Sequence, residues 1–135
     1  SLDEQCQSVL NAIQPDSYTP PHRHELSNPR ELLMAVRGRL APLEFDDEGG
    51  VVSCVQFGTE LHHDDECQSV GVELLPSSWH TVLAMEEDSV LLEVKQGPFV
   101  PYEGKELAAW AQKAGSKGAE LLVAERQARA RRDEL

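Results

Sequence analysis

The chain has 135 residues, of which 40% are hydrophobic, and it carries a formal net charge of −12 at pH 7. Its length suits one domain with its own core, and its acidity argues against nucleic-acid backbones and anionic membranes as partners. No apolar run approaches the roughly 20 residues of a membrane span, and the N-terminus lacks the basic and apolar regions of a secretory signal, so we expect a cytoplasmic protein.

The first segment, Asp3 to Ile13, has apolar side chains at helical spacing behind acidic residues in its first turn. This pattern predicts a short amphipathic helix that ends at Pro15. Residues 1–16 are therefore predicted to be a helix and lead-in to the main domain.

A series of short apolar segments separated by turn residues follows, as expected for strands. The predicted strands are Glu31–Arg37, Leu40–Phe45, Val51–Phe57, Ser69–Leu75, His80–Met85 and Ser89–Lys95. Between two of them, Asp46 to Gly50 has the composition of a hairpin turn. Residues 17–101 are therefore predicted to form a mainly β sandwich or barrel, and the jelly roll is one such architecture.

The character of the sequence changes after Pro98. Lys105 to Lys113 is predicted to be helical, and Ala119 to Arg132, rich in Ala, Glu and Arg, is predicted to be a second helix with Glu125 and Arg129 one turn apart. Residues 102–135 are thus predicted to be a helical tail on the surface or at an interface.

Two histidines stand two residues apart, near the start of the predicted β domain. His22 and His24 fall on one face if the segment is extended, because alternate residues of a strand point the same way. Glu31 opens the next apolar run, and His80 opens another run further along. Three imidazoles and one carboxylate suit one divalent transition metal, and iron, manganese, nickel, cobalt, copper and zinc all accept these donors.

Other interpretations of the histidines compete with this one. A His-x-His pair also occurs by chance on protein surfaces. The stretch Leu61 to Cys67, LHHDDEC, gathers potential metal ligands too, but no apolar run frames it, and we predict a solvated loop. The cysteines, Cys6, Cys54 and Cys67, lack zinc-like spacing and are predicted to be reduced thiols.

The spacing of the predicted ligands resembles the two sequence motifs of cupins. The first motif has two histidines, then a glutamate, then a glycine that follows the glutamate after six intervening residues. His22, His24, Glu31 and Gly38 match it. A shortened second motif is matched by Pro76 and His80. Within the cupins, the chain is similar to the WbuC family from about Asp3 to Ala111, over SYTPPHRH, ELLMAVRGRL, FDDEGGVV, PSSWHTV, LLEVKQGPF and KELAAWA.

This resemblance implies a fold, a site and a setting. The fold would be a single-domain cupin, a double-stranded β-helix or jelly-roll barrel, with a short N-terminal helix and C-terminal helices. The metal ligands would be His22, His24, Glu31 and His80. The setting would be bacterial surface-polysaccharide or O-antigen metabolism, and a homodimer is expected by analogy.

Five further residues are candidates for binding a substrate. Arg37, on the predicted inner face, suits either an anionic substrate group or a structural carboxylate. Trp79 suits packing at the barrel rim or stacking on a sugar ring. Glu93 and Lys95 share a strand face, as a polar pair at the pocket mouth or as an exposed ion pair. Tyr102 either covers the pocket or lies on the plain surface.

Three functions stay open on these observations. The first is a metal-dependent enzyme, isomerase- or epimerase-like, acting on a small polar substrate such as a sugar or sugar nucleotide. The second is a non-catalytic, metal-dependent module that binds a sugar. The third is a metal-dependent dioxygenase, because a divalent metal with open positions supports Lewis-acid, hydrolytic and redox chemistry.

Overall fold

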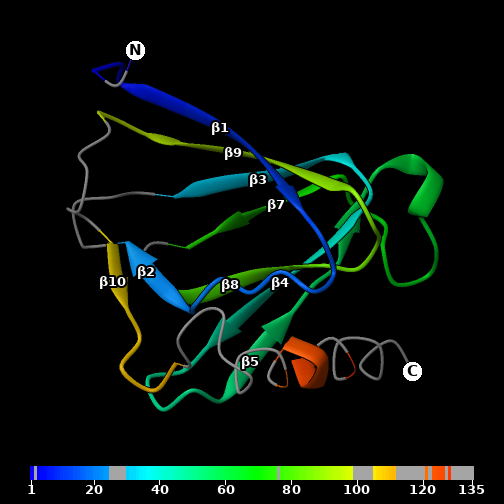
Figure 1. Ribbon diagram of the computed structural model, residues 1–135. Helices are drawn as coiled ribbons and strands as arrows, with labels where there is room; N and C mark the ends of the chain where they lie inside the picture. Colours follow the sequence, from blue (N-terminus) through cyan, green and yellow to red (C-terminus); the bar gives the residue numbers. More distant parts are fainter. Residues whose placement is uncertain are drawn as a thin grey trace.

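The computed structural model describes residues 1, 3–24, 30–75, 77–98, 105–111, 121, 123–126 and 128, with the backbone alone for His24, Lys105 and Glu106. In this part of the chain the strands pair into two antiparallel sheets that lie one above the other (Figure 1). The first sheet has the order β1 (Cys6–Ile13), β9 (Ser89–Gln96), β3 (Glu31–Arg37) and β7 (Gly71–Leu74). The second has the order β10 (Lys105–Leu107), β2 (His22–His24), β8 (Trp79–Ala84), β4 (Arg39–Phe45) and β5 (Val51–Cys54), with β6 (Phe57–Gly58) also paired to β4. A short 3-10 helix, η1 (Glu60–His62), follows β6.

The strands predicted between residues 31 and 96 are confirmed, with small shifts at their ends. The predicted strand Val51–Phe57 is divided, because β5 ends at Cys54 and β6 begins at Phe57. The hairpin turn is also confirmed, since the Asp46 amide donates to the Gly50 carbonyl at 2.9 Å. Turn residues and apolar alternation thus place most of the β framework correctly.

The core lies between the two sheets. It is formed by buried residues from both, namely Leu33, Leu40, Phe57, Leu74, Ala84 and Leu91. Ala35 of β3 and Val82 of β8 pack against this cluster, so these strands present apolar side chains to the inside. Two antiparallel sheets packed face to face around one apolar core are the architecture expected of a double-sheet jelly roll, so the predicted mainly β fold is confirmed.

The outer face of the second sheet is covered by the chain's own C-terminal part. Leu43, Phe45 and Leu83 form a second cluster with Ala108, and Trp110 packs against it. The helical residues 121, 123–126 and 128 include two buried side chains, Val123 and Arg126. The described part of the predicted second tail helix is therefore helical and packed on the barrel.

The outer face of the first sheet has a different character. Its outward positions are apolar on three strands, and Leu10, Leu32 and Val36 are 64%, 39% and 53% exposed. A contiguous exposed apolar surface often marks a protein interface. The homodimer stays a prediction, and this face is where its interface would be sought.

The prediction of an N-terminal helix is wrong. Residues 6–13 form β1, which pairs with β9 along its whole length, from Cys6 opposite Gln96 to Ile13 opposite Ser89. The apolar spacing that suits a helix also suits a strand with Val9 and Ile13 on the inner face and Leu10 outside. Pairing with β9 satisfies the backbone groups along one edge of this segment, and such tertiary context overrides weak helix propensity.

The predicted helix from Lys105 to Lys113 is wrong over its described part. Lys105–Leu107 is strand β10, antiparallel to β2, and the Ala111 amide closes a turn onto the Ala108 carbonyl. The partner strand again decides the outcome, because β2 offers an open edge to this segment.

Among the residues that the structure describes, none of the helices has the length and apolar character of a membrane span.

Candidate metal centre

Two of the predicted ligands lie side by side in the second sheet. His22 of β2 is the direct register partner of His80 of β8. Antiparallel partners project to the same face of a sheet, and the two imidazole rings are 4.5 Å apart between centroids, with a 57° angle between their planes. The sheet itself therefore brings together histidines that stand far apart in the sequence.

The third predicted ligand comes from the opposite sheet. Glu31 is the first residue of β3, and its Oε2 lies 3.6 Å from His80 Nε2. Both side chains are only 6% exposed. Burial of polar side chains is costly, so buried polar groups usually have a structural or functional role. This contact across the barrel is therefore the clearest sign of a metal site.

Backbone carbonyls fix the tautomers of both histidines. His22 Nδ1 lies 3.0 Å from the Pro20 carbonyl oxygen, and His80 Nδ1 lies 2.8 Å from the Ser78 carbonyl oxygen. A carbonyl can only accept a hydrogen bond, so each neutral ring carries its proton on Nδ1 and its lone pair on Nε2. Metal-binding histidines in proteins are oriented in this way.

The fourth predicted ligand, His24, is described by its backbone only. It lies in β2 two residues after His22, opposite Lys105 of β10. Among the described residues, no three His, Cys, Asp or Glu side chains form a complete metal-binding group, so the four-ligand set stays a prediction.

A further carboxylate faces His80, and sequence reasoning missed it. Glu44 of β4 is the register partner of His80, and its Oε2 accepts a hydrogen bond from Ser78 Oγ at 3.1 Å. Ser78 thus contacts both His80 and Glu44. The available signal was the alternation of β4, because Leu40 and Glu44 stand four residues apart and share the inner face.

The register also places two of the candidate substrate residues on the inner face. Lys95 is opposite Glu31, and Glu93 is opposite Leu33. Asn11 of β1 donates a hydrogen bond from Nδ2 to Glu93 Oε2. This position favours the interpretation of Glu93 and Lys95 as pocket lining. Asn11 was missed because its segment was expected to be a helix.

Arg37 does not lie with the histidines, and its predicted inward orientation is wrong. The register of β3 against β9 shifts between Ala35 and Arg37, so that Ala35 is opposite Leu91 and Arg37 is opposite Val90. Such a bulge inserts one residue and reverses the strand alternation beyond it. Arg37 consequently lies on the outer side, beside the exposed Val36.

Trp79 lies on the outer face of the second sheet, where it is 8% exposed. Its Nε1 donates to Asp47 Oδ1 at 3.0 Å, and the Arg23 guanidinium lies 4.3 Å above its ring. These contacts support the packing interpretation of Trp79 over sugar stacking. Arg23 points away from the histidines, as strand alternation requires. Tyr102 lies outside the described residues.

The rival stretch from Leu61 to Cys67 forms a loop stabilised by its own hydrogen bonds. Arg39 Nη1 lies 2.7 Å from Asp64 Oδ2, and the amides of Glu66 and Cys67 donate to Asp64 Oδ1 at 2.9 Å. The Glu66 amide and the Arg39 side chain together lower the pKa of Asp64. These bonds support the interpretation as a solvated structural loop.

Comparison with known proteins shows the fold and little beyond it. A family model described as a domain of unknown function, DUF6016, matches residues 1–57. No curated protein sequence matches the chain.

Three solved structures illustrate the likeness. A Shewanella oneidensis protein determined by a structural genomics consortium aligns over 96% of this chain and 74% of its own, with a TM-score of 0.60 and 14% identity. A dTDP sugar isomerase from Desulfovibrio desulfuricans aligns over 76% of this chain and 63% of its own, with a TM-score of 0.55 and 15% identity.

The third, the oxalate decarboxylase of Bacillus subtilis, a protein with Mn(II) centres, aligns over 77% of this chain and 24% of its own, with a TM-score of 0.54 and 15% identity. This chain therefore spans less than two thirds of both enzymes. At these identities the likenesses establish a common fold, and function has to be argued from the site.

Proposed function

We propose that this chain is a metal-binding cupin that holds one divalent transition metal through His22, His24, Glu31 and His80. The observation that carries the proposal is the buried contact of Glu31 with His80 across the barrel, beside the tilted ring of His22. Three strands from two sheets supply these groups. A purely structural ion pair would not need the second histidine.

The chemistry of the donor set fits such an ion. In the tautomers that the carbonyls fix, Nε2 of His22 and of His80 holds a lone pair, and Glu31 supplies one negative charge. Nitrogen and carboxylate donors suit iron, manganese, nickel, cobalt, copper or zinc. When bound, such an ion polarises an oxygen of a substrate or activates water or oxygen.

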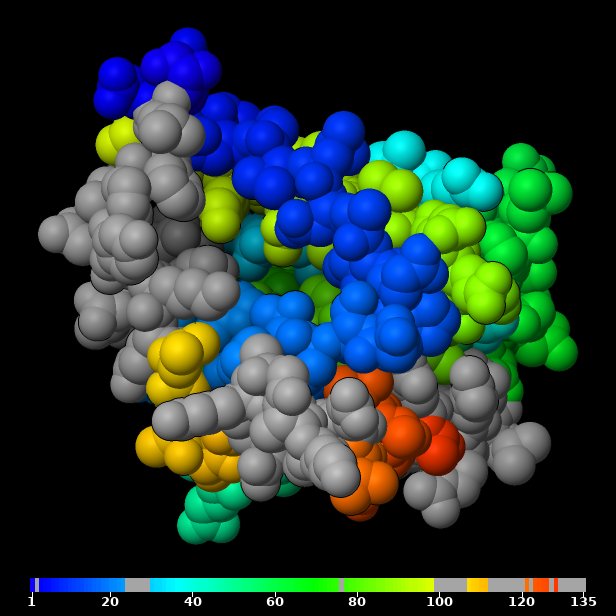
Figure 2. Space-filling view, in the orientation of Figure 1, coloured from blue at the N-terminus to red at the C-terminus, as the bar shows by residue number. Residues whose placement is uncertain are grey.

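The chain's own residues would bind and orient the substrate next to these ligands. Lys95, opposite Glu31, offers a cation for a phosphate group, and Glu93 and Glu44 offer hydrogen-bond acceptors for hydroxyl groups. The apolar side chains of the core below exclude water. In the space-filling view, the surface is hollowed between the blue residues of β1 and the lighter blue residues of β2 (Figure 2).

A sugar or sugar nucleotide is the substrate class that we propose. Its support is the resemblance to a polysaccharide-linked cupin family, together with the fold shared with a dTDP sugar isomerase. On this proposal the protein is a bacterial, cytoplasmic enzyme of isomerase or epimerase type in surface-polysaccharide metabolism. A non-catalytic, metal-dependent module that binds the same ligand is the second candidate.

Calorimetric titration tests the substrate class. Metal-loaded protein and chelator-treated protein are each titrated with dTDP-glucose, dTDP, glucose phosphate and glucose. We expect binding of the sugar nucleotide that is lost without metal and weakened about tenfold or more in Lys95→Gln, because a charge-assisted hydrogen bond is removed. Sugar-nucleotide binding that is equally strong without metal, or no binding at all, would contradict the proposal and favour the dioxygenase alternative. Oxygen uptake by the iron-loaded protein is the measurement for that alternative.

A further inference from the structure

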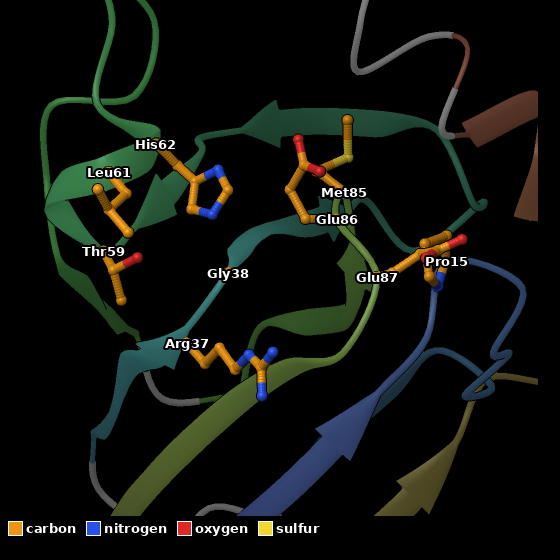
Figure 3. Close-up of a pocket in the computed structure, with 9 residues that line it drawn as sticks. All are labelled: Pro15, Arg37, Gly38, Thr59, Leu61, His62, Met85, Glu86 and Glu87. Carbon is orange, nitrogen blue, oxygen red and sulfur yellow. The ribbon is translucent and has the colours of Figure 1, made fainter.

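A cavity of about 620 Å³ lies on the molecule away from the histidine cluster. It is lined by Pro15, Arg37, Gly38, Thr59, Leu61, His62, Met85, Glu86 and Glu87. Figure 3 shows these residues around Gly38, with Arg37 below it, His62 above it and the two glutamates to the right. Arg37 and Glu31 are the two ends of β3, and six residues of strand span roughly 20 Å, so this cavity is separate from the proposed metal centre.

The cavity contains charges of both signs that do not neutralise each other. Among the described residues, no ion pair or side-chain hydrogen bond engages the guanidinium of Arg37, the imidazole of His62 or the carboxylates of Glu86 and Glu87. Arg37 and the two glutamates line different sides of the cavity. Their separation across a cavity leaves room for a ligand that meets both signs.

The walls that carry these groups are tied to the barrel. The Thr59 amide donates to the Gly38 carbonyl at 3.0 Å, and the His62 amide donates to the Thr59 carbonyl at 2.9 Å, which holds the wall formed by η1. On the other side, Ser89 Oγ donates to the Glu86 carbonyl at 2.8 Å. Side chains on fixed backbone lose less freedom on binding than those on a mobile loop.

The floor and the orientation of Arg37 depend on local backbone geometry. Gly38 has a φ of 81°, and a Cβ atom there would overlap Ser89 Oγ, so only glycine gives the ligand this close approach to the backbone. The bulge before Arg37 turns its side chain out of the core and into the cavity. The bulge that removes Arg37 from the metal centre thus supplies the cation of this second site.

We propose that this cavity binds a small zwitterion, a molecule with one carboxylate and one ammonium group. The carboxylate pairs with the Arg37 guanidinium, which presents a planar fork of donors matched to two oxygens. His62 and the Thr59 hydroxyl line the same cavity and offer further hydrogen bonds to the ligand. The ammonium group lies between the carboxylates of Glu86 and Glu87, and the volume is within the usual range for small-molecule sites.

The test uses the full chain and ligands matched in length. Glycine, β-alanine, γ-aminobutyrate and ε-aminocaproate are titrated, each against the carboxylate and the amine of equal chain length, and backbone amide shifts are followed by NMR. At least one zwitterion is expected to bind more tightly than both of its single-charge controls. The shifts are expected at residues 37–38, 59–62 and 85–87, and to be absent at His22 and His80.

Variants of the lining residues complete the test. Arg37→Gln should weaken zwitterion binding about tenfold, because one charge-assisted bidentate contact is removed. The double variant Glu86→Gln, Glu87→Gln should make the zwitterion no better than its carboxylate control. Arg30→Gln changes an exposed arginine outside the cavity and should have no effect.

Three outcomes would overturn the proposal. These are no zwitterion binding up to about 10 mM, equal binding of the single-charge controls, and affinity unchanged by Arg37→Gln. His22→Ala should leave this binding intact, which separates a failure of this site from a failure of the proposed metal centre.

Discussion

At the scale of single residues, the position of a carboxylate relative to His80 decides its role. Glu31 contacts His80 Nε2, the ring atom that holds the lone pair, whereas Glu44 is linked through Ser78 to the opposite side of the ring. A group at Nε2 can share a metal with that histidine, whereas a group behind Nδ1 is not placed to do so. The two glutamates therefore predict different phenotypes.

Glu31→Gln is expected to weaken metal binding about tenfold or more, because the amide removes the negative charge from the donor set. Glu44→Gln is the matched control, and it should keep the metal while altering only the contact with Ser78. Metal affinity by competition with a fluorescent chelator is the measurement. Equal losses of metal affinity in both variants would contradict the distinction between the two glutamates. Loss in Glu44→Gln alone would exchange their assigned roles.

Asp64 gives the loop after η1 a dependence on pH. Its pKa is lowered in the folded protein by the Glu66 amide and by Arg39, so the charged form contributes stability above the unfolded-state pKa of about 3.9, and this contribution is lost as the pH falls through the folded-state pKa. The melting temperature of wild type should exceed that of Asp64→Asn at pH 7, and the difference should shrink toward pH 3. A difference that stays constant over this range would contradict the assignment.

Residue types, together with the resemblance to the cupin motifs, were enough to predict the juxtaposition of His22, Glu31 and His80. They failed for Arg37, because the bulge after Ala35 inserts one residue and reverses the facing of the next side chain. No residue type in this stretch predicts the bulge. The inward position of Glu44 could have been predicted, since Glu44 alternates in phase with Leu40, which lies in the core between the sheets.

At the scale of elements, the junction between β3 and β4 depends on Gly38. Its positive φ is costly for any residue with a side chain, and a Cβ atom would overlap Ser89 Oγ. Gly38→Ala is expected to lower the free energy of unfolding by about 1–3 kcal/mol. Ser89→Ala removes the nearest overlapping atom, Oγ, but leaves Ser89 Cβ 2.9 Å from the added Cβ and leaves the backbone strain, so the double variant should recover part of the loss.

Denaturant unfolding of Gly38→Ala, Ser89→Ala and the double variant measures this coupling. Additive effects of the two substitutions would show that the overlap has no energetic weight.

Elements whose partners are distant in sequence could not be assigned from local pattern. β1 and β10 are strands because β9 and β2 present open edges to them, and their own sequences are compatible with helices as well. The central strands were predictable, because their Val and Leu residues alternate between turns that Gly, Asp and Pro define. Local signals therefore identified the barrel and missed the strands that are added at its edges.

At the scale of the whole molecule, the proposed metal would link the two sheets. Glu31 belongs to the first sheet, and His22 and His80 belong to the second. A ligand bound only by the folded state stabilises it, so a chelator should lower the melting temperature of protein purified with its metal. The apolar core between the sheets is independent of the site, and the far-UV circular dichroism should stay that of a β protein. Unfolding on metal removal would instead indicate a structural metal.

The central claim is that His22, His24, Glu31 and His80 hold one divalent transition metal. Elemental analysis of protein purified without added metal tests it most directly, with His80→Ala and Trp79→Phe prepared in parallel. We expect about one transition-metal ion per wild-type chain and per Trp79→Phe chain, because Trp79 lies on the outer face, and strongly reduced metal in His80→Ala. Two results would contradict the account. One is wild-type protein that is metal-free and takes up none of the six candidate ions, and the other is full metal occupancy in His80→Ala.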